Sequence, residues 1–236
     1  MATVFEASAA IAMFRRPYTT TSSVSYPLPT PTAVAGLLAS ITGLDNGCQE
    51  RGFAAQYWQY LQGTRIAIQM LAPLKWRSET INFWNVKEPQ KNPHIQVKHQ
   101  FISRPRYRFY VHGGVEEELK KYLSWGAFVY TPYLGVAYAV ADIKYCGHYP
   151  WEPVVLEQAD VSTVVPYMNN LEVDILSSGG AFRERIPYRL TQDRSLVETL
   201  PILYQTDPDK KLRLIKRGEL DVTQCGEDIV AWFPAW

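Results

Sequence analysis

The sequence is poor in cysteine. Cys48, Cys146 and Cys225 are the three cysteines among 236 residues, and none stands in a C-x-x-C spacing. Isolated cysteines of this kind indicate neither a disulfide framework nor a zinc site. We therefore expect three ordinary thiols, buried or half-buried.

Several motifs of enzymes are also missing. The chain has no G-x-x-x-x-G-K, no G-x-S-x-G and no paired carboxylates in a metal-binding pattern. Nucleotide hydrolysis, esterase chemistry and two-metal nuclease chemistry therefore find no support in the sequence. We expect neither a metal nor a cofactor.

Long hydrophobic runs are absent as well. The apolar run 33–41 is far too short to cross a bilayer, and the first twenty residues lack an apolar core behind a basic start. Hydrophobic residues make up 47% of the chain and the mean hydropathy is −0.19. We expect a globular cytoplasmic protein without membrane contact, folded as one large domain or two small ones.

The most distinctive segment present is a proline-punctuated helix start. Prolines at positions 27, 29 and 31 hold the chain extended, because the residue before a proline avoids the helical region. Thr30 suits the N-cap of a helix, apolar residues follow Val34 at i+3, i+4 and i+7, and Gly43 suits its end. The spacing predicts a helix that packs against a sheet.

The loop before this helix is basic and rich in hydroxyl groups. Its side chains offer hydrogen-bond donors suited to phosphate oxygens, although a merely solvated loop would have a similar composition. The candidate RNA-binding residues of this loop are Arg15, Arg16, Tyr18, Thr20, Ser22 and Tyr26.

Positive charge is concentrated in one part of the chain. Residues 75–110 hold eight basic and two acidic residues, whereas the whole chain has a net charge of only +1. Aromatic residues alternate with these charges, as in surfaces that bind phosphates and stack on splayed bases. The candidate RNA-binding residues of this segment are Lys75, Trp76, Arg77, Lys98, Arg104, Arg106 and Arg108.

The chain up to residue 148 predicts an α+β fold. Strands are expected at 3–7, 64–71, 106–112 and about 135–145, with helices after Thr30, at about 50–61 and at 115–125. This β-α-β-β-α-β order is typical of a ferredoxin-like, RRM-like domain. A long hairpin at about 75–103 is inserted into it. In strand 106–112, Tyr107, Phe109 and Val111 share one face, and the basic residues share the other. The usual stacking signature of an RNA recognition motif is absent.

Residues from about 149 to 236 form a strand-rich, mildly acidic region. A glycine turn at 179–180 precedes an arginine-rich strand, in which Arg183 and Arg185 are further RNA-binding candidates. A flexible turn followed by an ordinary surface strand, without any role in RNA binding, would have a similar sequence.

Three of these segments together resemble the CRISPR-associated Cas five family of the RAMP superfamily. They are the 14–41 pattern, the hairpin with its exit Arg104-Pro105-Arg106-Tyr107, and the arginine-rich turn at 177–190. The type I-B branch is the most similar. The resemblance implies a non-catalytic subunit of a Cascade complex that grips the 5′ handle of the crRNA. It also implies that the hairpin is a thumb, which displaces a nucleotide and contacts the backbone subunit of the Cas seven family. The resemblance further implies that the large subunit lies against the other side and that target DNA is met through the complex.

Two alternatives remain open. In the type I-C branch the same family cuts repeat RNA without metal, which requires general acid–base residues around one phosphate. His94, His99, His112, His148, Tyr107, Tyr110 and Lys98 qualify by residue type alone. The second alternative is a protein interaction module whose basic hairpin meets an acidic partner.

Overall fold

The computed structural model describes residues 1–19, 22–47, 54–55, 57–154 and 158–236. Thr20, Cys48 and residues 50–53 and 56 of the helix predicted at 50–61 lie outside these residues. Among the residues of that range that the structure describes, only the single turn α2 (Tyr57–Tyr60) is helical. Among the described residues, no helix has both the length and the apolar character needed to cross a membrane.

The centre of the fold is a four-stranded antiparallel sheet. It consists of β1 (Ala2–Ser8), β6 (Arg65–Met70), β9 (Arg106–His112) and β10 (Asp142–Tyr149), in the order β10-β1-β9-β6. Helices α1 (Pro31–Thr42) and α2 lie between β1 and β6 in the chain, and α3 (Glu116–Trp125) lies between β9 and β10. This order of elements matches the prediction for residues up to 148.

Both faces of this sheet are covered. Phe5, Tyr107 and Phe109 join the largest cluster of buried residues, together with side chains of α1 and α3. Val4 and Tyr110 point to the opposite side and pack against residues close to the C-terminus. The alternation predicted for strand 106–112 is therefore confirmed, but its second face is not open along its whole length.

Helix α1 begins and ends as its sequence predicts. The Thr30 hydroxyl accepts a hydrogen bond from the Ala33 backbone N–H at 3.3 Å. Gly43 adopts φ +79°, a conformation that glycine tolerates without strain, and its N–H caps the carbonyl of Ala39 at 2.8 Å.

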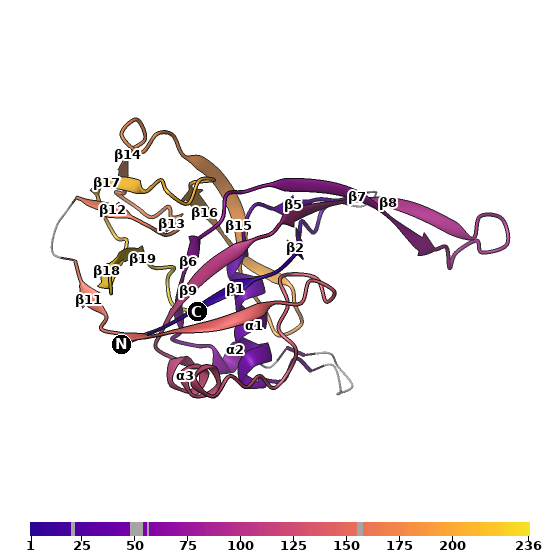
Figure 1. The fold of residues 1–236 in the computed structure, drawn as a ribbon, viewed down its shortest axis with the longest axis horizontal. Helices are drawn as coiled ribbons and strands as arrows, with labels where there is room; N and C mark the ends of the chain where they lie inside the picture. Colours follow the sequence, from indigo (N-terminus) through magenta and orange to yellow (C-terminus); the bar gives the residue numbers. More distant parts are fainter. Residues whose placement is uncertain (20–21, 48–53, 56, 155–157) are drawn as a thin grey trace.

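A long hairpin extends away from the rest of the protein (Figure 1). Its strands β7 (Trp76–Trp84) and β8 (His94–Ser103) pair from Trp76–Ile102 to Trp84–His94. At its base, β8 also pairs with β2 (Ile11–Ala12) and, in parallel, with β4 (Ser22–Ser23). Two further short strands, β3 (Phe14–Arg15) and β5 (Ser25–Tyr26), pair with each other.

The strand predicted at 135–145 is wrong in its position. Strand β10 starts only at Asp142, and 135–141 forms turns closed by a bridge between Tyr133 and Val140. Gly135 explains the difference, because it adopts φ +85° and a Cβ atom there would lie 2.1 Å from the carbonyl oxygen of Met13. The conformation of residues 135–141 is therefore determined by the close approach of two backbones and not by the alternation of apolar residues.

The remainder of the described chain is strand-rich, as predicted. Three small sheets have the orders β11-β18-β19, β12-β17-β14 and β13-β16-β15. Their strands are β11 (Glu152–Pro153), β12 (Ala159–Val161), β13 (Val165–Pro166), β14 (Glu172–Asp174), β15 (Phe182–Leu190), β16 (Leu196–Tyr204), β17 (Leu212–Lys216), β18 (Val222–Cys225) and β19 (Asp228–Ala231). Ile186, Tyr188 and Phe233 join the same buried cluster as Phe5 on the helix side of the central sheet, whereas Val230 and Trp232 of the same region pack with Val4 on the opposite side.

Candidate nucleic-acid interface

The basic N-terminal loop lies directly against the hairpin. Ser22 pairs with Lys98 in the parallel β4–β8 register, and the Ser25 N–H donates to the Gln100 Oε1 atom at 3.4 Å. Arg15, Tyr18 and Lys98 are exposed here. The structure thus brings together two of the segments that were predicted to bind RNA, although they are more than seventy residues apart in the chain.

Arg16 connects this loop to β15. Its Nη2 atom lies 2.5 Å from the Glu184 Oε2 atom, and its Nη1 atom donates to the Tyr18 hydroxyl at 2.8 Å. Its guanidinium group also lies 4.6 Å from the centre of the Tyr26 ring, which is buried and 5% exposed. Because the Arg16 side chain is only 20% exposed and is paired with Glu184, its main role is to stabilise the conformation of the loop.

Arg183 and Arg185 lie on the other side of β15. Successive side chains of a strand point to opposite faces, so both arginines point away from Glu184 and hence from Arg16. Arg183 stands 5.0 Å from the centre of the Tyr167 ring, and the Arg185 Nη1 atom donates to the Thr199 hydroxyl at 3.2 Å. Both are exposed, and the structure does not gather them with the loop.

The base of the hairpin carries four further candidates. Lys75, Trp76 and Arg77 are exposed at the start of the hairpin, and Arg77 forms a salt bridge with Glu79. Arg104 follows β8 with φ +47°, a left-handed conformation that is costly for a residue with a Cβ atom. Its N–H donates to the Ala10 carbonyl at 2.9 Å, which holds the turn in place and leaves its side chain in solvent.

Arg106 and Arg108 flank a buried carboxylate. The Arg106 Nη2 atom lies 2.6 Å from the Glu6 Oε2 atom, and the Arg108 Nη2 atom lies 2.8 Å from the Glu6 Oε1 atom. Burial alone would raise the pKa of Glu6, but hydrogen bonds and positive charge from the two arginines outweigh it and hold this pKa below its usual value. Arg108 also contacts Asp228 at 3.0 Å, whereas the Arg106 side chain stays about half exposed.

Sequence reasoning missed the acidic partners of Arg16, Arg106 and Arg108, which are Glu184, Glu6 and Asp228. Glu6 interrupts an otherwise apolar first strand, and this was the available signal of a charge partner. Glu184 stands between Arg183 and Arg185 and lies 168 residues from Arg16, a distance in sequence that no local pattern bridges.

The comparisons with known proteins identify a family. A family model described as CRISPR-associated protein (Cas_Cas5) matches residues 3–166. The chain belongs to the Cas5 family. No curated protein matches it.

Solved structures share the Cas5 chain's fold at low sequence identity. A chain of a CRISPR RNA-guided surveillance complex is 13% identical with a TM-score of 0.52, and the match covers 91% of each chain. A CRISPR protein from Archaeoglobus fulgidus is 14% identical with a TM-score of 0.54, over 98% of this chain and 99% of that one. A chain of the Type III-B Cmr-beta complex bound to cognate target RNA is 10% identical with a TM-score of 0.54, over 90% and 86%.

The side chains considered for acid–base catalysis in this Cas5 chain do not converge. Tyr107 and Tyr110 are almost fully buried, and burial raises the pKa of both phenols. His99 is buried on the hairpin between the rings of Phe83 and Phe101. His94 lies towards the hairpin tip, where it packs against Trp84.

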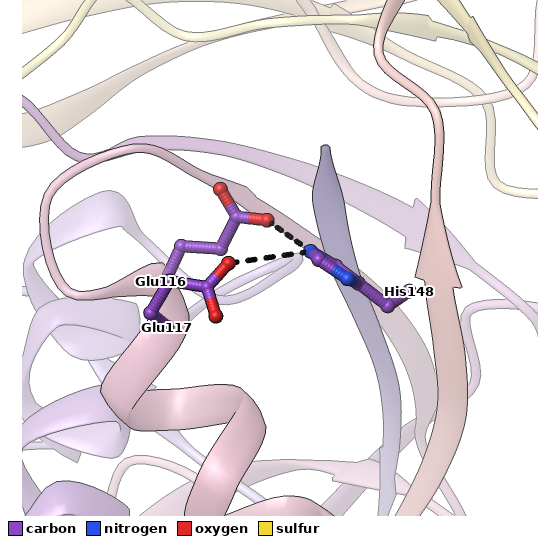
Figure 2. Close-up of side chains that lie close together, drawn as sticks. All are labelled: Glu116, Glu117 and His148. Atoms are coloured by element: carbon purple, nitrogen blue, oxygen red, sulfur yellow. Dashed lines mark hydrogen bonds and ion pairs between the residues drawn. The ribbon is translucent and has the colours of Figure 1, made fainter.

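The other two histidines surround a buried glutamate at the start of α3. Figure 2 shows the His148 ring pointing at the carboxylates of Glu116 and Glu117, with its Nε2 atom 2.8 Å and 3.9 Å from them. The His112 Nδ1 atom lies 2.6 Å from the Met1 carbonyl oxygen and 3.5 Å from Glu116. The ligand atoms of Glu116, Glu117 and His148 lie within 4.8 Å of one another, as a metal ion would require. Hydrogen bonds from His148 and from the Gly113 N–H already satisfy the Glu116 carboxylate and fasten α3 to the sheet.

Proposed function

We propose that this chain is a non-catalytic crRNA-binding subunit of a type I Cascade complex, which caps the 5′ handle of the guide RNA. The observation that carries the proposal is the joining of the basic loop 14–26 to the exposed hairpin through the β4–β8 pairing. In this proposal, phosphates of an RNA strand lying along this junction contact Arg15, Lys98 and the hydroxyl groups of the loop. The RNA bases stack on the rings of Tyr18 and Trp76.

The fold supports this role. The order β10-β1-β9-β6, with a helix in the connection before β6 and another before β10, supports our assignment of a ferredoxin-like domain. We assign residues 1–148 to that domain and 149–236 to a second, strand-rich region that packs on it. The hairpin acts as a thumb between RNA bases.

The partners follow from the same proposal. The apolar side chains on the hairpin, among them the exposed Phe83 and Ile95, suit contact with a backbone subunit of the Cas seven family. The large subunit lies against the opposite side of the chain, and target DNA is met through the complex. We place the complex in the type I-B branch and in the cytoplasm.

Arg106 and Arg108 take a different role from the one their sequence pattern suggests. Because Glu6 and Asp228 already pair with them, Arg108 stabilises the sheet, and Arg106 offers phosphate only its exposed half. In this proposal, Arg183 and Arg185 contact RNA only if the RNA strand bends around β15.

One gel tests the proposal against the endoribonuclease alternative. Purified protein is mixed with end-labelled repeat RNA in a chelator, and both the mobility shift and cleavage are followed. The proposal expects a salt-sensitive shift with intact RNA, weakened about tenfold by Arg15→Ala combined with Lys98→Ala, and unaffected by the matched Lys216→Ala variant. A discrete cut that survives the chelator would make the chain a processing enzyme.

A further inference from the structure

Three side chains that can ligate a metal ion converge where α3 meets β10. Figure 2 shows the His148 ring, on β10, pointing at the carboxylates of Glu116 and Glu117, which begin α3. One ligand atom from each of the three residues lies within 4.8 Å of the others. Glu116 and His148 are separated by 32 positions along the chain, so no local sequence pattern indicated this cluster.

The separations between the ligand atoms suit a small divalent ion. The His148 Nε2 atom lies 2.8 Å from the Glu116 Oε1 atom and 3.9 Å from the Glu117 Oε1 atom. Zn²⁺ binds imidazole nitrogen and carboxylate oxygen at about 2.0–2.2 Å in tetrahedral geometry, which places neighbouring ligand atoms about 3.3–3.6 Å apart. The two observed separations lie on either side of this range. Small side-chain rotations therefore bring all three atoms to bonding distance from one ion.

Two of the three ligands are already held in position. Glu116 is 6% exposed, and its Oε2 atom accepts a hydrogen bond from the Gly113 N–H at 2.9 Å and lies 3.5 Å from the His112 Nδ1 atom. These contacts leave the Oε1 atom directed at His148, whose side chain is 14% exposed. Hydrogen bonds to a ligating carboxylate orient it for a metal ion. Glu117 is exposed, so it supplies an adjustable third ligand and a route from solvent.

The charges of the cluster also favour a divalent cation. Among the described residues, Lys120 is the one lysine or arginine that forms an ion pair with either glutamate, and it lies 3.5 Å from the Glu117 Oε2 atom. The Oε1 atoms of Glu116 and Glu117 face the Nε2 atom of His148 instead. That atom carries one proton at most, so it donates a hydrogen bond to one carboxylate and leaves the other without a donor. A divalent cation bonds to both carboxylates at once.

We propose that Glu116, Glu117 and His148 bind one Zn²⁺ ion, with water in the fourth position. Zn²⁺ accepts imidazole as a ligand, whereas Mg²⁺ prefers oxygen ligands. The ion replaces the Nε2 proton that His148 donates to Glu116. This proton goes to the Nδ1 atom of the same ring or, where that atom is already protonated, to solvent. The bound ion links the first turn of α3 to β10, and this structural role does not depend on RNA.

Two measurements on the full-length protein test the proposal. In the first, protein that has been treated with a chelator and freed from it is titrated with Zn²⁺ and, separately, with Mg²⁺ in a calorimeter. We expect Zn²⁺ to bind at this site, and Mg²⁺ to bind at least tenfold more weakly. In the second, NMR spectra of the histidine rings are recorded as Zn²⁺ is added. The ring signals of His148 should shift with the first equivalent, and those of His94 should not.

Glu117→Gln is the decisive variant, because the Glu117 side chain is 75% exposed and its replacement preserves the fold. We expect it to weaken Zn²⁺ binding at least tenfold. The matched control Glu118→Gln changes an exposed glutamate of the same helical turn, outside the cluster, and is expected to bind Zn²⁺ as the original chain does. His148→Gln should weaken Zn²⁺ binding as well, although it also alters the hydrogen bond to Glu116.

Absence of Zn²⁺ binding overturns the proposal. Binding that is unchanged in Glu117→Gln overturns it as well, because other histidines or the thiols would then be the ligands. Binding of Mg²⁺ as tight as that of Zn²⁺ would show that the imidazole of His148 is not a ligand. All three outcomes leave the proposed RNA binding standing, since the cluster shares no residue with the proposed RNA interface.

Discussion

Arg16 and Glu184 form a salt bridge, with 2.5 Å between the Nη2 and Oε2 atoms, that ties the basic loop to a strand of the C-terminal region. Both side chains are about four-fifths buried, so the pair is screened less by solvent than an exposed pair. It fixes the position of a loop that local sequence alone does not order. We therefore expect the proposed RNA binding to depend on loop stability at Arg16 and to be separable from it at Arg15.

We predict that Arg16→Ala lowers the free energy of unfolding by about 1–2 kcal/mol, because it leaves the Glu184 carboxylate without its partner. Arg15→Ala, on an exposed side chain of the same loop, changes it by less than about 0.5 kcal/mol. Urea denaturation measures both. In a double-mutant cycle, Arg16→Ala and Glu184→Gln show a coupling of about 1 kcal/mol, and additive effects would contradict the structural role of the pair.

Glu6 provides a prediction on pH. Because the pKa of Glu6 is held below its usual value in the folded chain, its contribution to stability is present above the ordinary carboxyl pKa. The contribution is lost as the pH falls through the lowered, folded-state pKa. Glu6→Gln is expected to cost about 2–3 kcal/mol at pH 7, since it leaves Arg106 and Arg108 without their shared charge.

The Glu6→Gln variant lacks the carboxylate whose stabilising contribution the original chain loses in acid. Its difference in unfolding free energy from the original chain should therefore shrink below about pH 4. Melting curves between pH 3 and 7 measure this, and a difference that is constant with pH would show that Glu6 is not a charged partner.

The hairpin tip is expected to matter for function and not for folding. Residues 85–93 connect the last pair, Trp84–His94, and are mostly exposed. Replacing them with Asn-Gly gives a two-residue turn that suits antiparallel strands. We expect stability within about 0.5 kcal/mol of the original, together with loss of the chain from an affinity-purified Cascade complex. A shortened hairpin that assembles normally would remove the proposed contact with the backbone subunit.

His148 has a structural role that can be measured. His148→Ala removes a 2.8 Å hydrogen bond to the buried Glu116, and we expect a loss of about 1–3 kcal/mol. His94→Ala, on the exposed hairpin, serves as the matched control and should be neutral. Melting curves with Zn²⁺ and with a chelator test whether Glu116, Glu117 and His148 bind a metal ion. A rise in melting temperature with Zn²⁺ that His148→Ala abolishes would support metal binding.

The sequence predicted those features that depend on neighbours along the chain. Thr30 and Gly43 mark the ends of α1 because caps are local chemistry, and strand 106–112 shows its two faces because alternation is local as well. The strand at 135–145 was misplaced because a close backbone contact between Gly135 and Met13 decides it. The partners of Arg16, Arg106 and Arg108 were missed because Glu184, Glu6 and Asp228 reach them only through the tertiary fold.

Footprinting tests most directly whether this chain caps the 5′ handle of the crRNA, as we propose. 5′-labelled crRNA in the assembled complex is treated with hydroxyl radicals, with and without this subunit. We predict protection of the repeat-derived handle that depends on the subunit and is weakened by Arg15→Ala combined with Lys98→Ala. Protection of the handle that persists without the subunit, or dependence confined to the 3′ end, would contradict it.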